Sequence, residues 1–190
     1  MNTQNDAPIR GNSVGHEGSL FGRRRRDRLI ALGLSMTTPL ALGGAGGVIT
    51  ARAIPGWYAE LTKPSWNPPS WLFGPVWTVL YVAMGVAAWR VWRRGAAPEA
   101  TPALRAEVRS ALLIYVVQLA LNASWTPMFF GLKRVDVALA IIIAMLVAIA
   151  ETVRRFYRLD RPAALLLLPY LGWVAFATVL NGSIWLLNRE

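Results

Sequence analysis

The sequence predicts an all-α integral membrane protein, a five-transmembrane-helix bundle with a long, lid-like first loop. Two observations favour this fold class. First, 55% of the 190 residues are hydrophobic and only 16% are charged, whereas soluble domains carry roughly 25% charged residues. Second, the apolar residues gather into blocks of about 20, the length that crosses a bilayer as a helix. We therefore expect a polar, basic, disordered N-terminal tail over residues 1–28 and one membrane domain over residues 29–190.

Five apolar segments are expected to form the helices. They run from Leu29 to about Thr50, from Trp71 to about Trp92, from about Ser110 to Phe130, from Val135 to about Arg154, and from just after Pro162 to about Leu187. The connection over residues 51–70 contains four prolines and a glycine, so it cannot be one continuous helix. Its aromatic residues favour a loop that folds back on the bundle as a lid. The alternative is that they only anchor the loop at the membrane interface.

The positive charges predict the orientation of the chain. Fifteen of the twenty basic residues fall in the tail, in the second loop or in the fourth loop. This asymmetry places the N-terminus inside and the aromatic loop outside. The run Arg23–Arg28 is expected to anchor the first helix at anionic headgroups, although an organellar targeting segment has a similar composition. A net charge of +10 would suggest nucleic acid in a soluble protein, but these charges lie between apolar blocks, so no nucleic-acid partner is expected.

Residues for conventional catalysis are scarce in the sequence. The chain has no cysteine, and its single histidine, His16, lies in the tail. Asp136 and Glu151 fall near the ends of the fourth helix, where the membrane interface explains them, so a proton pump lacks its usual groups. We expect no catalytic residue and no metal site.

Aromatic and amide residues recur at helical spacing along three of the expected helices. They are Phe73, Trp77, Tyr81 and Gly85 on the second helix, Gln118, Asn122, Trp125 and Phe129 on the third, and Tyr170, Trp173, Ala177 and Asn181 on the fifth. Tryptophans at helix ends are explained by an interfacial belt, but Trp77, Trp125 and Trp173 lie deeper. Two interpretations remain open: an ordinary core with hydrogen bonds between helices, or a pocket for a planar, mostly apolar ligand.

Three separated motifs cover most of the chain. They read WYAELTKPSWNPPSWLFGPVWTVLYVAMG from Trp57, QLALNASWTPMFFG from Gln118 and PYLGWVAFATVLN from Pro169. In this order they resemble the translocator protein family, also called tryptophan-rich sensory protein (TspO) or peripheral-type benzodiazepine receptor. The resemblance spans about residues 29–188 and leaves only the tail outside.

The resemblance implies a pocket capped by the first loop, with porphyrins such as protoporphyrin IX, or haem, as ligands and no required cofactor. Carried over by motif position, the pocket residues are Trp57, Tyr58, Pro68, Trp77, Tyr81, Asn122, Trp125, Phe129, Trp173 and Ala177. Animal members also carry a cholesterol-recognition pattern at the end of the last helix. Here Gly182 takes the place of its tyrosine, which argues against cholesterol as the native ligand.

The expected function is a membrane receptor or translocator for tetrapyrroles, used in tetrapyrrole homeostasis or stress sensing. The alternatives are an enzyme that degrades porphyrin with light and oxygen, and a structural membrane protein that binds a partner. Gly43 with Gly47, and Ala120 with Ser124, favour a homodimer. The excess of arginine over lysine is compatible with a bacterial membrane, with the mitochondrial outer membrane as the alternative.

Overall fold

The computed structural model describes residues 14–189, apart from the side chains of residues 14–25, 27 and 28. Its elements are α1 (Val14–Ala53), α2 (Trp57–Glu60), η1 (Ser70–Leu72), α3 (Phe73–Gly95), α4 (Pro102–Thr126), η2 (Pro127–Gly131), α5 (Val135–Leu159) and α6 (Arg161–Leu187). Within this part of the chain, five helices are long and apolar enough to cross a membrane. The predicted all-α bundle with five membrane spans is therefore confirmed.

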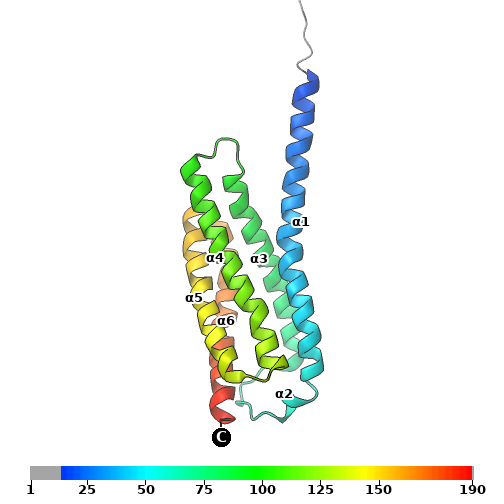
Figure 1. Ribbon diagram of the computed structural model, residues 1–190, viewed down its shortest axis with the longest axis vertical. Coiled ribbons are helices and arrows are strands. Elements are labelled where there is room, and N and C mark those ends of the chain that lie inside the picture. Colours follow the sequence, from blue (N-terminus) through cyan, green and yellow to red (C-terminus); the bar gives the residue numbers. More distant parts are fainter. Residues whose placement is uncertain (1–13, 190) are drawn as a thin grey trace, which may run out of the picture.

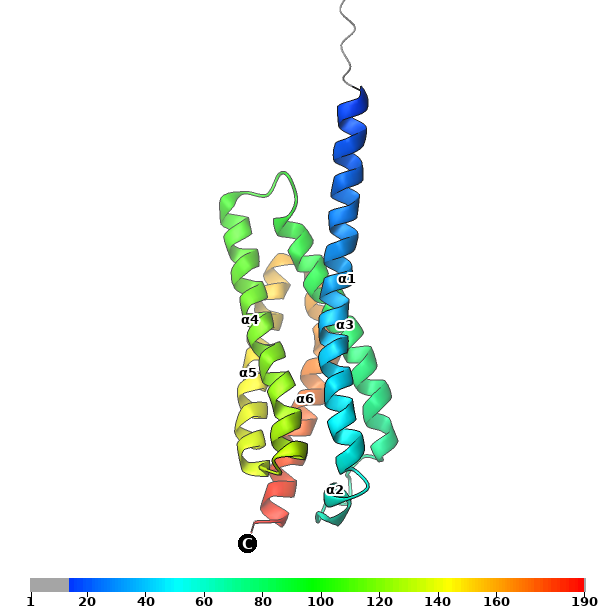
Figure 2. The ribbon, with the colours of Figure 1, turned by 45° about the vertical axis from the view of Figure 1, so that its right-hand side comes forward.

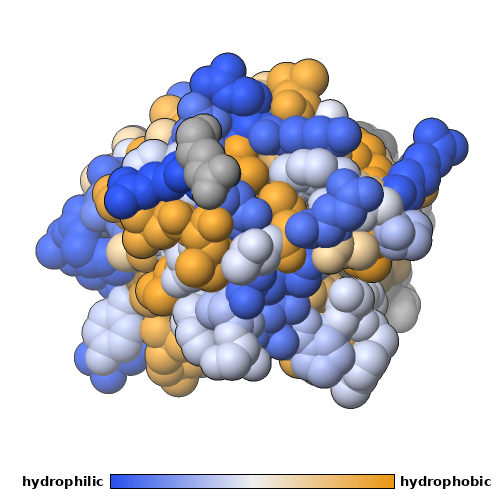
Figure 3. All heavy atoms as spheres, turned by 90° about the horizontal axis from the view of Figure 1, so that it is seen from below, coloured by the Kyte–Doolittle hydropathy of each residue, from blue (hydrophilic) through white to orange (hydrophobic). Residues whose placement is uncertain are grey.

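The long helices stand side by side, as Figures 1 and 2 show from two directions. α2, the turn between α4 and α5, and the C-terminal end lie at the lower end of the bundle (Figure 1). The loop between α3 and α4 and the start of α6 lie toward the opposite end, beyond which α1 projects. The two groups of loops that the arginine count separates are therefore at opposite ends of the molecule. Seen from below, the lower end mixes hydrophilic and hydrophobic side chains (Figure 3).

Two helices begin earlier than the hydropathy pattern predicts. α1 starts at Val14 instead of Leu29, and no proline lies between residues 9 and 38 to break it. The tail prediction for residues 1–13 lies outside the described residues. α4 starts at Pro102 instead of Ser110, because the Thr101 hydroxyl accepts a hydrogen bond from the Leu104 N–H at 3.1 Å and caps the helix.

The core of the bundle lies between α3, α4, α5 and α6. Side chains such as Met84, Ile142 and Val174 are buried there, whereas α1 is peripheral. Only 6% of the most apolar stretch of α1 is buried, against 28% to 33% in the other spans. α1 still contacts α3 closely at Gly85, where an added Cβ would lie 2.7 Å from a backbone oxygen of α1. A glycine is therefore required at this crossing.

A buried aspartate ties α3 to α6 at the upper end. Asp160 is 5% exposed and accepts hydrogen bonds from Arg90 Nε at 2.9 Å and from Arg94 Nε at 3.3 Å. It also caps α6 by accepting from the Ala163 N–H at 3.0 Å. Burial by itself would raise the pKa of Asp160, but the hydrogen bonds from Arg90 and Ala163 and the two arginine charges outweigh it and lower the pKa.

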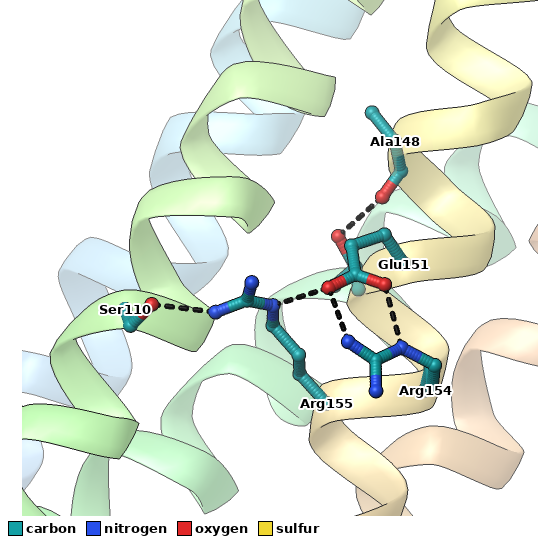
Figure 4. Close-up of polar contacts among 6 residues, drawn as sticks. Ser110, Ala148, Glu151, Arg154 and Arg155 are labelled. Carbon is teal, nitrogen blue, oxygen red and sulfur yellow. Dashed lines mark hydrogen bonds and ion pairs between the residues drawn. The ribbon is translucent and has the colours of Figure 1, made fainter.

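The acidic groups of α5 are also paired with arginines. Glu151 accepts from Arg154 Nε at 2.7 Å and from Arg155 Nε at 2.6 Å (Figure 4). Arg155 donates in addition to the Ser110 hydroxyl and so links α5 to α4. At the other end of α5, Asp136 pairs with Arg134 at 2.7 Å. Both acids thus have cationic partners close to the helix ends.

We predict that Asp160→Asn makes the fold less stable at neutral pH and removes a pH dependence. Because folding lowers the pKa of Asp160, its carboxylate stabilises the protein above the unfolded-state value of about 3.9. This stabilisation is lost as the pH falls through the lower folded-state pKa. Asparagine retains the helix cap, so the change isolates the charge pairs, worth about 1–3 kcal/mol. In thermal unfolding in detergent, the wild type and Asp160→Asn should differ more at pH 7 than at pH 3. An equal difference at both values would contradict this.

Candidate functional site

A chain of buried hydrogen bonds joins three helices in the middle of the bundle. Tyr81 Oη on α3 donates to Asn122 Oδ1 on α4 at 2.9 Å, and Asn122 Nδ2 donates to Tyr170 Oη on α6 at 3.2 Å. Tyr170 Oη then donates back to Gln118 Oε1 on α4 at 2.8 Å. All four side chains are buried. The hydrogen bonds between helices expected of Gln118 and Asn122 are therefore present.

Asn181 makes a second connection lower in the bundle. Its Oδ1 accepts from Trp125 Nε1 at 3.0 Å, and its Nδ2 donates to the Val135 carbonyl oxygen at 3.0 Å. This one amide fixes α6 against both α4 and α5. It also locks the orientation of the Trp125 indole ring, which stacks on Phe129 with centroids 5.1 Å apart.

A cavity of about 460 Å³ lies between these connections and the first loop. Aromatic rings supply much of its wall, and their contacts hold them in place. Trp77 stacks on Tyr81 at a centroid distance of 5.3 Å, and Phe73 meets Trp173 edge-on at 6.0 Å. The cavity is therefore walled by flat rings whose planes are fixed by their neighbours.

A turn of π-helix shapes one side of the cavity. Proline has no N–H to continue the hydrogen bonding of α4, and at Pro127 the helix widens into η2. The Leu132 N–H then donates to the Pro127 carbonyl at 2.8 Å. Phe129 and Phe130, both on this turn, line the cavity. The proline was visible in the sequence, but the widened turn was not predicted.

The first loop lies against the lower end of the bundle. Tyr58 is buried and donates from Oη to Asn67 Oδ1 at 3.0 Å, and burial raises the pKa of its phenol, with that hydrogen bond as a smaller opposing effect. Asn188 at the end of α6 exchanges two hydrogen bonds with the backbone of Thr62, at 3.0 and 2.9 Å. The loop is thus attached to the bundle at both aromatic and polar points.

Eight of the ten predicted pocket residues line this cavity: Tyr58, Trp77, Tyr81, Asn122, Trp125, Phe129, Trp173 and Ala177. Trp57 and Pro68 are not among the described residues that line it. Trp57 instead meets Phe129 edge-on at 5.8 Å, from outside the cavity. The motif placed Trp57 among the pocket residues, but it could not show that this ring packs behind Phe129 and does not face the cavity.

One wall was missed in the sequence analysis because it comes from α1. Its lining residues there are Leu40, Gly43, Gly44, Gly46, Gly47, Thr50, Ala51 and Ile54. From the sequence, Gly43 and Gly47 favour close approach of another helix, or bending, and do not indicate a cavity wall. The structure adds that the small residues leave room for the cavity and bring the backbone of α1 to its edge.

Small exposed residues form the rim on this side. The exposed residues that line the cavity are Gly44, Gly47 and Ala51 on α1, Ser70 on η1, and Gly74 and Thr78 on α3. All lining residues of α4, α5 and α6 are buried or partly buried. The cavity therefore opens sideways between α1 and the start of α3, within the membrane-spanning segments.

The Trp173 indole N–H is a buried polar group of a lining residue that sequence reasoning did not single out. Its Nε1 atom is buried and has no hydrogen-bond partner among the described residues. A buried donor without an acceptor costs about 1–3 kcal/mol. The Asn122 and Asn181 amides, which looked available in the sequence, already have partners, whereas the Trp173 indole N–H has no acceptor among the described residues.

Charged and metal-binding groups are absent from the described lining of the cavity. Likewise, no cluster of three or more His, Cys, Asp or Glu residues occurs in the described part of the chain. These features define a class: an integral membrane protein whose five helices enclose an uncharged, aromatic cavity. The chain belongs to the TspO/MBR family, whose sequence profile matches residues 35–186.

Individual relatives agree with this assignment. The chain is 39% identical over 165 residues to the tryptophan-rich protein TspO of Chlorobaculum tepidum, covering 85% of this chain and 98% of the relative. It is 41% identical over 152 residues to the tryptophan-rich sensory protein of Cereibacter sphaeroides, covering 80% and 89%. It is 43% identical over 131 residues to the human translocator protein, covering 68% and 73%. The family resemblance predicted from the three motifs is confirmed.

We predict that Gly43→Ala destabilises the protein while Gly44→Ala does not. An added Cβ at Gly43 would overlap the ring of Tyr81, which is buried, stacked on Trp77 and hydrogen-bonded to Asn122. At Gly44 nothing lies within 4 Å, and alanine has the higher helix propensity. Overpacking typically costs about 1–3 kcal/mol, so the melting temperature in detergent should fall only for Gly43→Ala. Equal melting temperatures for both variants would contradict the predicted steric overlap between a side chain at position 43 and the Tyr81 ring.

Proposed function

We propose that the protein is a membrane receptor or translocator that binds tetrapyrroles, such as protoporphyrin IX, in the aromatic cavity. The observation that carries the proposal is a cavity of about 460 Å³ walled by fixed aromatic planes. This volume lies within the range of about 300–1,000 Å³ typical of small-molecule sites. Flat rings attract a flat macrocycle by stacking and burial. The relatives named translocator protein and tryptophan-rich sensory protein are consistent with a ligand-handling role.

The unpaired indole of Trp173 gives the proposal a polar contact. A tetrapyrrole such as protoporphyrin IX carries carboxylates, which are strong hydrogen-bond acceptors. One oxygen placed near Trp173 Nε1 would satisfy the buried donor. Because no charged residue is among the described residues that line the cavity, orientation of the ligand would depend on this contact and on stacking.

Titration of protoporphyrin IX into the purified protein in the dark tests the proposal. Binding should quench tryptophan fluorescence saturably, and Trp77→Ala should weaken it more than tenfold by removing a stacking surface. Trp173→Phe keeps a ring and removes only the donor, so we expect a loss of about three- to tenfold. Trp71→Phe is the matched control, because Trp71 is 73% exposed and does not line the cavity.

Two outcomes would contradict the assignment. If the porphyrin does not bind saturably, the proposed function fails. If it binds but Trp77→Ala and Trp173→Phe retain the affinity of Trp71→Phe, the ligand binds elsewhere. Intact porphyrin recovered after illumination would count against the alternative of photo-oxidative degradation.

We also propose that the ligand exchanges with the bilayer through the opening between α1 and α3. Gly44 lies about 13 Å from the end of α1, at 1.5 Å per residue, which is within the hydrocarbon region. The hydroxyls of Thr50 and Thr78 are bonded to carbonyls of their own helices, at 3.0 and 2.9 Å. These two hydroxyls therefore present no free donor to the apolar macrocycle of the ligand. The alternative route requires the first loop to open as a lid.

We predict that Gly47→Leu slows both association and dissociation of protoporphyrin IX and leaves its Kd nearly unchanged. An obstacle in an access route raises the barrier equally in both directions. Gly47 has nothing within 4 Å of an added Cβ, so folding should be preserved. Gly33→Leu is the control, because Gly33 is equally open on the same helix but does not line the cavity. Stopped-flow fluorescence measures both rates. Unchanged rates for Gly47→Leu would favour entry under the loop instead.

The distribution of charge supports an orientation in which the end with α2 faces the outside. Arg90, Arg94, Arg154 and Arg155 all lie toward the opposite end, in agreement with the arginine asymmetry of the sequence. We propose this orientation together with a bacterial membrane as the location. Cysteine introduced at Glu60, on the exposed part of α2, should react with an impermeant maleimide from outside intact cells. If the cysteine at position 60 does not react with the maleimide in intact cells, the end with α2 faces the inside and the proposed orientation is wrong.

A further inference from the structure

A second hollow lies outside the aromatic cavity, at the lower end of α1. Its volume is about 390 Å³, and it is lined by Val48, Ile49, Arg52, Ala53, Trp57, Phe130 and Lys133. These residues come from the end of α1, from α2, from η2 and from the turn before α5. Five of its seven lining residues are apolar or aromatic, and the other two are cationic. We call it the α1 groove.

The basic residues of this end of the molecule differ in whether they already have oxygen partners. Lys63 Nζ donates to the carbonyl oxygens of Tyr58 and Leu61, both at 2.7 Å, and Arg134 is paired with Asp136. Arg52 and Lys133 have no acidic partner in the described part of the chain. Both of these cations line the same groove. Arg189, at the same end, also has no acidic partner among the described residues, but it lies over the Trp185 ring, with 5.5 Å between the guanidinium carbon and the ring centroid.

The backbone of Lys133 adds an independent observation. Its φ of 57° is the one left-handed conformation of a non-glycine residue in the described chain. Such a conformation costs about 1–2 kcal/mol for most L-residues. Hydrogen bonds on both sides hold it, from the Leu132 N–H to the Pro127 carbonyl at 2.8 Å and from the Arg134 N–H to the Met128 carbonyl at 2.9 Å. The left-handed conformation therefore fixes the backbone from which the Lys133 side chain extends. Its Nζ lies 5.9 Å from the centroid of the Trp57 ring.

The chemistry of the groove changes along the membrane normal. Arg52, Lys133 and Trp57 are at the level where α1 ends, whereas Val48 lies about 8 Å deeper, at 1.5 Å per residue. Val48 is 56% exposed, in a segment that is apolar enough to span the membrane. An occupant must therefore present a negative group at the interface and an apolar chain below it. A soluble anion would leave the apolar part of the groove unused.

From this arrangement we infer that the α1 groove binds an anionic phospholipid, with its phosphate between Arg52 and Lys133 and an acyl chain along Val48 and Ile49. Charge complementarity favours an acidic headgroup over a zwitterionic one, since two cations face the site and no carboxylate partner is in reach. Trp57 lies at the level preferred by interfacial aromatic rings. The site is separate from the aromatic cavity, and the inference does not depend on tetrapyrrole binding.

The test compares lipids retained by the full-length protein from nanodiscs that contain equal amounts of phosphatidylglycerol and phosphatidylcholine. Native mass spectrometry counts the bound lipids. The wild-type protein should retain phosphatidylglycerol preferentially. Arg52→Gln and Lys133→Asn should each lower the ratio of phosphatidylglycerol to phosphatidylcholine about fivefold, the effect of one basic residue at a membrane surface. Asparagine tolerates the left-handed conformation at position 133, so this variant should fold normally.

Arg189→Gln is the matched control, because it removes one positive charge from the same end without touching the groove. Its lipid ratio should equal that of the wild type. An equal loss in all three variants would overturn the inference, since it would reflect only the general surface charge. Equal retention of both lipids by the wild type would overturn it as well. Displacement of phosphatidylglycerol by added protoporphyrin IX, one for one, would assign the two cations to tetrapyrrole carboxylates instead.

Discussion

The hydrogen-bond chain from Tyr81 through Asn122 and Tyr170 to Gln118 is the constraint on which the rest of the bundle depends. In hydrocarbon, an amide or phenol without a partner costs several kcal/mol, and bilayer lipids cannot replace a lost partner. Rotation of α3, α4 or α6 by even one residue would break the chain. The four side chains therefore fix the register of three helices, and Asn181 extends this control to α5.

The cavity lies between the hydrogen-bonded side chains in the middle of the bundle and the first loop. Toward the first loop, the cavity is lined by Trp77, Trp125 and Trp173, whose rings contact neighbouring tyrosine and phenylalanine rings and leave part of the space unfilled. On the remaining side, α1 contributes glycines and few buried side chains. The same small residues allow α1 to approach α3 and leave the cavity open toward the bilayer. Close packing of α1 and the opening of the cavity thus depend on the same small residues.

Charged side chains at the two ends of the bundle differ in whether they form ion pairs. At the upper end, Asp160 and Glu151 are each held by two arginines, so the acids stabilise helix contacts. At the lower end, Arg52 and Lys133 have no acidic partner among the described residues and line the α1 groove. The ion pairs at the upper end stabilise the contacts between helices. Arg52 and Lys133 are instead the basis for the proposed binding of an anionic lipid in the α1 groove.

The sequence by itself determined the five membrane spans, because their length and hydropathy are local properties that need no knowledge of neighbours. Helical spacing and the family motifs also identified eight residues that line the cavity, including Trp77 and Trp173. Only the tertiary structure decided that Asn122 and Asn181 already have partners while the Trp173 N–H does not. It likewise placed Trp57 outside the cavity and the glycines of α1 along its wall. These outcomes depend on contacts between helices far apart in the chain, and no single segment contains that information.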